Sequence, residues 1–113
     1  MIKADIPFFE LLLKYSERIV KYSEGSTLDE FVSNEMVYDA CLMNFINIGK
    51  VCKEISEESK MKYPQIPFRK IIGLRNIAAH NYEGIEAFHL YQIVTEIVPP
   101  FKNQIAEILN NDQ

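Results

Sequence analysis

The segment from Gly73 to Tyr82 reads GLRNIAAHNY and places four polar, chemically capable side chains inside an apolar helical run. From Ile71 to Ala79 the apolar residues cover nearly every side of a helix, a pattern typical of a helix buried among other helices. We therefore expect this helix to lie inside an all-α protein whose remaining helices surround it. An arginine, an asparagine and a histidine in such a helix need an explanation, either functional or structural.

Helical periodicity continues on both sides of this segment, and no strand pattern interrupts it. We predict a helix from Asp5, as N-cap, to Gly25, a capped turn at Thr27 and Glu30, a helix from Ser33 or Asn34 to about Ser59, a loop over 60–67, the motif helix from Phe68 to about Ala79, a helix from Ile85 to Val98, a break at Pro99-Pro100, and a last helix from Phe101 to Leu109. This pattern predicts an antiparallel bundle of four to five helices in one domain over residues 1–113.

Composition favours a cytoplasmic protein with one core. The chain has 113 residues, of which 48% are hydrophobic, and it shows neither a membrane-length apolar run nor a signal peptide. Cys41 and Cys52 would lie about 16 Å apart on one helix, too far for a disulfide, and form no metal-ligand set with the two histidines. A net charge of −4 and a pI near 5.2 argue against a general nucleic-acid binder.

The polar residues of the motif helix fall on two faces. At about 100° per residue, Gly73, Asn76 and His80 share one face, whereas Arg75 and Tyr82 lie roughly 140° from His80. If the helix stays regular, joint chemistry of Arg75 and His80 needs a second copy of the chain, which a two-fold interface would supply. Gly73, which has no side chain, would allow another backbone to approach closely.

Arginine and histidine together can cleave RNA without a metal. The guanidinium binds phosphate, and the imidazole gives or takes a proton while the 2′-hydroxyl attacks the neighbouring phosphorus. The alternative is structural: Arg75 would be a buried partner of an acid such as Glu35 or Asp39, and His80 would be an ordinary hydrogen-bonded histidine.

The wider segment from Ile66 to Ile85, IPFRKIIGLRNIAAHNYEGI, closely resembles the signature of the HepT-like toxins of the HEPN ribonuclease superfamily. Arg75, His80 and Tyr82 match the motif Arg-x-x-x-x-His-x-Tyr, and Asn76 fills the polar position that commonly follows the arginine. The resemblance extends along most of the chain. It departs at Gly49-Lys50-Val51, where many relatives have Gly-Glu-Ala, and at Glu83, where an aromatic residue is common.

This resemblance implies an all-helical HEPN bundle that homodimerises, with the Arg and His of both subunits lining a shared cleft of a metal-independent endoribonuclease. Arg75, His80 and Asn76 would be the catalytic residues. The usual partner is an MntA-type nucleotidyltransferase antitoxin, which uses ATP to add AMP to the motif tyrosine, here Tyr82. The chain itself would need no cofactor, and its substrate would be RNA.

Positive charge gathers near the loop that leads into the motif helix, at Lys60, Lys62, Arg69 and Lys70. These side chains either belong to a solvated loop or contact the RNA backbone, with Lys62, Arg69 and Lys70 as the candidates. His89, between Phe88 and Leu90, has no ligand-spaced partner and is expected to be an ordinary, partly exposed residue. Two further alternatives stay open: a non-catalytic helical subunit that partners a small nucleotidyltransferase, and a purely structural dimer.

Overall fold

A computed structural model describes residues 2–80 and 86–112 of the chain. The elements are a 3₁₀ turn, η1 (Lys3–Asp5), α1 (Ile6–Ser23), α2 (Leu28–Ser33), α3 (Glu35–Glu54), α4 (Glu57–Lys62), α5 (Phe68–His80), α6 (Ala87–Gln92), a π-helical segment, η2 (Ile93–Ile97), and α7 (Val98–Asp112). Every regular element within 2–80 and 86–112 is helical, which confirms the predicted all-α class.

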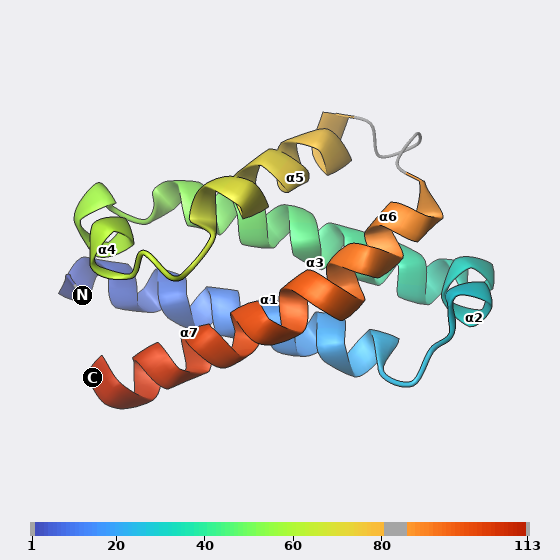
Figure 1. The fold of residues 1–113 in the computed structure, drawn as a ribbon, viewed down its shortest axis with the longest axis horizontal. Helices are drawn as coiled ribbons and strands as arrows, with labels where there is room; N and C mark the ends of the chain where they lie inside the picture. The colour runs from blue at the N-terminus through green and yellow to red at the C-terminus, as the bar shows by residue number, and fades with distance from the viewer. Residues whose placement is uncertain (1, 81–85, 113) are drawn as a thin grey trace.

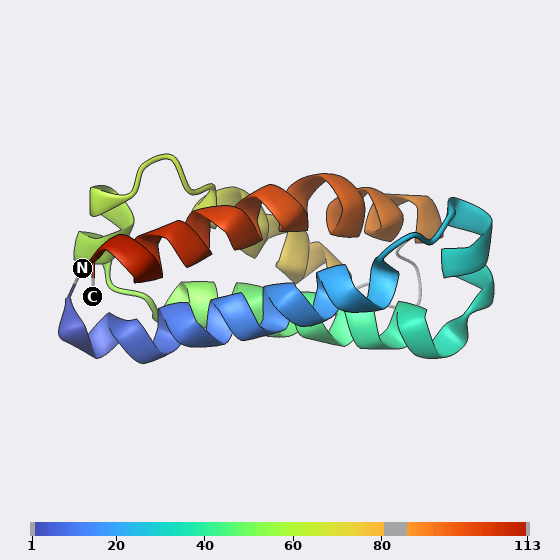
Figure 2. The same ribbon diagram turned by 90° about the horizontal axis from the view of Figure 1, so that it is seen from below.

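The long helices form an antiparallel bundle in two layers. Helix α1 packs between α3 and α7, and α5 packs along α3 (Figure 1). At right angles to that view, α1 and α3 form one layer, and α5 with the α6–α7 path forms the other (Figure 2). The core between the layers is apolar, and its largest fully buried side chains are Phe9, Phe31, Phe45, Phe101, Leu12, Ile19, Ile48, Ile71, Leu90 and Ile105.

Several local sequence signals act as predicted. Thr27 and Glu30 form a reciprocal capping box at the start of α2, with N···O distances of 2.9 and 3.2 Å. Asn34 caps α3 by accepting the backbone N–H of Val37 at 3.1 Å. Gly25 adopts a φ of 74° just after α1, where glycine has no steric penalty.

The predicted end of the long helix at Ser59 is wrong, because α3 ends at Glu54. Ile55 turns to extended backbone and is buried, and Ser56 accepts the backbone N–H of Ser59 at 3.2 Å as the N-cap of α4. A serine that caps a new helix competes with continuation of the old one. The loop expected over 60–67 therefore begins inside α4, which runs to Lys62.

The predicted break at Pro99-Pro100 is also wrong, since α6, η2 and α7 follow one helical path (Figure 1). The backbone N–H of Val98 bonds to the carbonyl of Ile93, five residues back, so the helix widens just before the two prolines. A widened turn changes the hydrogen-bond register at the point where two N–H groups are missing.

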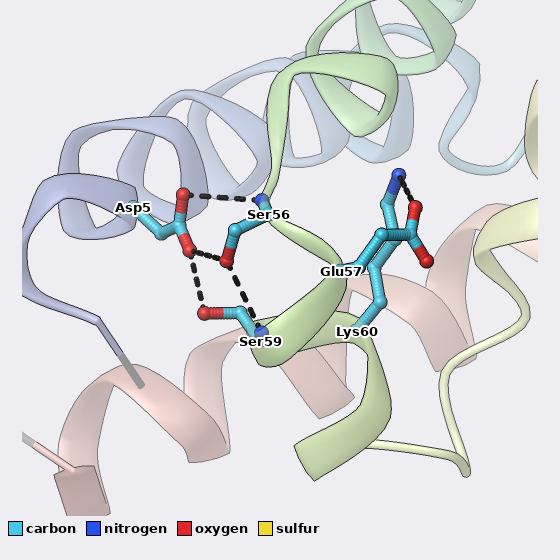
Figure 3. Close-up of polar contacts among 5 residues, drawn as sticks. All are labelled: Asp5, Ser56, Glu57, Ser59 and Lys60. Atoms are coloured by element: carbon cyan, nitrogen blue, oxygen red, sulfur yellow. Dashed lines mark hydrogen bonds and ion pairs between the residues drawn. The ribbon is translucent and has the colours of Figure 1, made fainter.

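Asp5 occupies the N-cap position of α1, as predicted, but its side chain makes no capping hydrogen bond. Its carboxylate instead accepts hydrogen bonds from the backbone N–H of Ser56 (3.3 Å) and from the hydroxyls of Ser56 (2.5 Å) and Ser59 (2.6 Å), as Figure 3 shows. These bonds join the first turn of the chain to the start of α4. Burial alone raises the pKa of Asp5, but the hydrogen bonds outweigh it and hold the pKa below its usual value.

Helix α5 is less buried within one chain than its apolar sequence predicts. It turns Phe68, Ile71 and Ala78 into the bundle, but the side chain of Ile77 is 56% exposed. At Gly73, no described atom other than those of the adjacent residues and the surrounding helix backbone lies within 4 Å of where a Cβ would stand. The expectation of a helix enclosed on all sides is therefore wrong for the single chain, because α5 has α3 along one face and solvent on the other.

Both cysteines are buried and free, as predicted. Burial raises the pKa of Cys41 to about 11 and that of Cys52 to about 12, although nearby Lys60 slightly opposes the second shift. None of the helices described here combines the length and the apolar character that crossing a membrane requires.

Candidate active site

Arg75 lies on the face of α5 that packs against α3. The buried anchors of α5 stand at positions 68, 71 and 78, and position 75 falls on the same stripe at 100° per residue. The arginine stem is therefore half-buried between the two helices that run side by side in Figure 1. This placement gives the side chain fewer accessible conformations than a surface arginine has.

Two hydrogen bonds fix the guanidinium of Arg75. Its Nε donates to the carbonyl oxygen of Ile46 on α3 at 3.3 Å, and its Nη1 donates to Oδ1 of Asn76 at 3.2 Å. A guanidinium has five N–H donors, so these two bonds leave most of its donors uncommitted within the described part of the chain. Asn76 thus contacts Arg75 directly, although side chains of consecutive residues on a helix point about 100° apart.

No acid neutralises Arg75 among residues 2–80 and 86–112. The one ion pair found there joins Lys60 to Glu57 at 3.6 Å on α4 (Figure 3). Glu35 and Asp39, the acids expected under the structural alternative, are both exposed on α3. The buried ion pair expected under the structural alternative is therefore absent among the described residues, where the positive charge remains available to an anion.

His80 is the last residue of α5 and is exposed. The helix is regular up to this point, so His80, five residues after Arg75, lies about 7.5 Å further along the axis and on a different face. No hydrogen bond joins the two side chains in the region that the structure describes. Tyr82, the predicted modification site, lies outside the described residues.

The predicted RNA-contact residues divide between two depressions. Arg69 and Lys70, both exposed in the first turn of α5, line a groove together with Lys60 of α4. Apolar side chains line the same groove, namely Met61, Pro64, Ile66, Pro67, Phe68 and Ile72. Lys62 lines a separate depression with Ile2 and Glu58, and its ammonium lies 5.6 Å from the centre of the Tyr63 ring.

Gly49 is a site residue whose role the sequence analysis did not identify. A Cβ built on Gly49 would stand 2.2 Å from both Cβ and Cγ of Arg75, so the arginine stem lies directly on this glycine. The sequence offered one signal for it, because a glycine in the middle of a helix lowers the helix's stability by about 1 kcal/mol relative to alanine. Such a position indicates close approach by another group.

Within the described residues, no three His, Cys, Asp or Glu side chains are grouped so that they could hold a metal ion. The polar groups that the structure places near Arg75 are a backbone carbonyl and an amide. Both groups accept hydrogen bonds from the guanidinium and so suit the orientation of an arginine for an anionic ligand.

Comparison with known proteins identifies the family. The model of the ribonuclease HepT-like family matches residues 12–108. The chain belongs to the HepT-like ribonuclease family. It is 30% identical over 106 residues to the Methanocaldococcus jannaschii protein named "Putative RNase MJ1380", covering 93% of this chain and 97% of that one. It is 23% identical over 101 residues to the "Probable ribonuclease HepT" of Thermococcus cleftensis, covering 89% and 92%.

No solved structure matches the chain. Family membership confirms the resemblance found in the HepT-like motif and agrees with the helical bundle. The motif residues Arg75, Asn76 and His80 all fall inside the matched region.

Proposed function

We propose that this HepT-like chain is a metal-independent endoribonuclease toxin that cleaves RNA with Arg75 and His80. The observation that carries the proposal is the state of Arg75, a half-buried arginine held by Ile46 and Asn76 with no acid paired to it in the described residues. An oriented and uncompensated guanidinium is suited to bind a phosphate and to stabilise the charge that develops on it. Family membership supports the same activity.

The reaction uses the 2′-hydroxyl of the RNA as the nucleophile. The 2′-oxygen loses its proton and bonds to the adjacent phosphorus, the bond from phosphorus to the 5′-oxygen breaks, and that oxygen takes up a proton. The products are a 2′,3′-cyclic phosphate and a free 5′-hydroxyl. His80 would transfer protons, Arg75 would stabilise the phosphoryl oxygens, and Asn76 would orient Arg75 and the substrate. DNA, which has no 2′-hydroxyl, cannot react by this route.

A homodimer would complete the site, because one chain carries Arg75 and His80 on different faces of α5. Exposed Ile77 and the open space beside Gly73 support a second chain approaching this helix. A two-fold axis would bring the same face of both α5 helices together. Each cleft would then combine Arg75 of one chain with His80 of the other.

RNA would enter along the groove between α4 and the start of α5. Lys60, Arg69 and Lys70 line this groove together with Glu57, the ion-pair partner of Lys60. The lining includes Ile72, which lies about one helical turn before Arg75 in α5. The cationic side chains suit the phosphate backbone, and the apolar lining suits a base. Lys62, on the neighbouring depression, would contact a more distant phosphate. These local cations would act against a net charge of −4.

Tyr82 would serve as the switch of a toxin–antitoxin system. An MntA-type nucleotidyltransferase would use ATP to add AMP to the tyrosine hydroxyl, releasing pyrophosphate. The added phosphate and nucleoside would stand close to the end of α5, where they would compete with the RNA phosphate by charge and by volume.

The direct test is cleavage of single-stranded RNA by purified, unmodified chain in excess EDTA. We expect cleavage by the wild type, none by Arg75→Ala or His80→Ala, and wild-type cleavage by His89→Ala, which removes the other histidine from an exposed position on α6. Folded wild-type protein that leaves a range of RNAs intact would refute the enzyme assignment.

The acidic pI of 5.2 favours a second candidate, a non-catalytic subunit that partners a small nucleotidyltransferase. Such a subunit would associate stably with the transferase and show neither RNA cleavage nor modification. Co-purification of the two chains, followed by the cleavage assay on the separated subunit, distinguishes the two functions.

A further inference from the structure

We propose that Gly49 is the positioning residue for Arg75, and that its missing side chain sets where the guanidinium meets the RNA phosphate. The inference rests on the proposed ribonuclease function and identifies a residue of α3, outside the motif helix, that this function requires.

The contact involves the fixed part of the arginine. A Cβ on Gly49 would stand 2.2 Å from Cβ and from Cγ of Arg75, and 3.0 Å from Cδ. Non-bonded carbon atoms normally approach to about 3.5–4.0 Å. The Cβ of Arg75 is attached to the backbone of α5, so a rotamer change cannot move it away. Any other residue at position 49 would therefore displace α5 itself or force it to rotate.

The contact also sets the direction of the guanidinium. With the stem resting on Gly49, Nε reaches the carbonyl of Ile46, which lies three residues before Gly49 on α3. Nη1 meets Oδ1 of Asn76 on the other side. The close approach at Gly49 and the bond to Ile46 thus fix the stem and the head of the side chain against the same helix. The remaining donors are left to face a ligand.

Glycine alone satisfies this geometry, although it reduces the stability of the middle of α3. The contrast with Gly73 is informative, because a Cβ there would meet no described atom within 4 Å beyond the adjacent residues and the backbone of its own helix. Gly49 is therefore the described helical glycine whose missing side chain is required by a contact with the candidate catalytic arginine.

The test uses Gly49→Ala, Arg75→Ala and the double variant, with Asn47→Ala as a control on α3 about 200° away from Gly49. Displacing a catalytic group by about 1 Å can cost on the order of 100-fold in rate, so kcat of folded Gly49→Ala should fall by about that factor. The control should retain wild-type kcat. Circular dichroism and gel filtration establish that each variant is folded.

A second readout separates positioning from stability. Binding to a 2′-O-methyl oligonucleotide, which cannot be cleaved, is measured over a range of salt concentrations. Loss of one phosphate contact lowers the slope of log Kd against log salt by about 0.7 for a single strand. We expect this decrease in Arg75→Ala and Gly49→Ala alike, with no further decrease in the double variant. A stability defect alone would not change the slope for the folded fraction.

The outcomes separate the two proposals. If Arg75→Ala retains wild-type cleavage and slope, the proposed function fails. If Arg75→Ala loses both but folded Gly49→Ala retains them, the positioning role fails alone, and it also fails if the two changes reduce binding additively. If Gly49→Ala does not fold, NMR of the three arginine side chains of the wild-type chain replaces it. The signal that disappears in Arg75→Ala is assigned to Arg75. A hindered, slowly exchanging Nε–H of Arg75 supports the role, and a freely rotating, rapidly exchanging one overturns it.

Discussion

The carboxylate of Asp5 and the hydroxyl of Ser59, 54 positions apart in the chain, are joined by a 2.6 Å hydrogen bond. Two further donors come from Ser56, so one buried carboxylate holds the first turn of the protein against the start of α4 (Figure 3). This network lies at the start of α4, the helix that precedes the loop leading into the motif helix. It joins the first turn of the chain to the helix whose Lys60 and Met61 line the proposed RNA groove.

The first prediction concerns the pH dependence of unfolding. Because the folded pKa of Asp5 lies below its unfolded value, the stabilisation is complete above the unfolded pKa of about 3.9 and is lost as pH falls through the folded pKa. Asp5→Asn should lower the free energy of unfolding at pH 7 by about 2 kcal/mol, the scale of hydrogen bonds to a charged group. Urea unfolding at pH 7 measures this difference.

The difference in unfolding free energy between Asp5→Asn and wild type should become smaller as the pH drops below about 4. The wild type then loses the stabilisation from the ionised carboxylate, which the variant lacks at every pH. Asp39→Asn, the same chemical change at an exposed position of α3, serves as the control and should have little effect on the unfolding free energy. A constant difference between Asp5→Asn and wild type from pH 7 to pH 3 would contradict the role of the ionised carboxylate.

Sequence periodicity was sufficient for the helices that have an uninterrupted apolar stripe, and capping chemistry was sufficient at Thr27 and Asn34. These local signals were insufficient where a residue distant in sequence determines the local structure. Asp5 was predicted to cap its own helix, but two serines about 50 positions later offer it three donors. At Pro99 the widened turn of η2 retains the helical path, and no local pattern predicts such a register change.

The candidate site shows the same division. The motif identified Arg75, Asn76 and His80, and helical geometry predicted that Arg75 and His80 point apart. The support of Arg75 could not be predicted, because Ile46 and Gly49 lie more than 25 positions away and contribute a backbone carbonyl and an absent side chain. The glycine in the middle of a helix indicates that another group approaches closely, but nothing in the sequence says that this group is Arg75.

The second prediction concerns the thiols. With pKa values of about 11 and 12, caused by burial, Cys41 and Cys52 should carry almost no thiolate at pH 8 and should react with a disulfide reagent only when the fold opens. Labelling of native protein should therefore be slow and should accelerate sharply in denaturant, where two thiols react per chain. Fast labelling of the native chain at either cysteine would show that α3 is open to solvent where the structure has it packed.

The third prediction concerns Tyr82. When the chain is co-expressed with an active MntA-type nucleotidyltransferase, its intact mass should rise by about 329 Da per AMP added. Peptide mapping should place the addition on Tyr82, and Tyr82→Phe should stay unmodified. Because the added phosphate would compete with RNA, the modified chain should lose cleavage while Tyr82→Phe keeps it in the presence of the transferase. Modified protein that still cleaves RNA would contradict the switch.

The fourth prediction tests whether each chain holds half a site. Arg75→Ala and His80→Ala are each expected to be inactive, but a dimer of one with the other would pair the intact Arg75 of one chain with the intact His80 of its partner. One of its two sites would be complete, and random mixing makes about half of all dimers mixed, so the mixture should recover roughly a quarter of wild-type activity.

Mixing after brief denaturation and refolding, or co-expression with two different tags, allows the chains to exchange. The control is the double variant Arg75→Ala/His80→Ala mixed with either single variant, in which every site lacks a group and no activity should return. Failure of the two single variants to complement each other, with exchange verified by the tags, would mean that Arg75 and His80 act within one chain. In that case α5 would have to depart from regular helix at His80 when RNA binds, because in the free chain its regular course directs the two side chains to different faces.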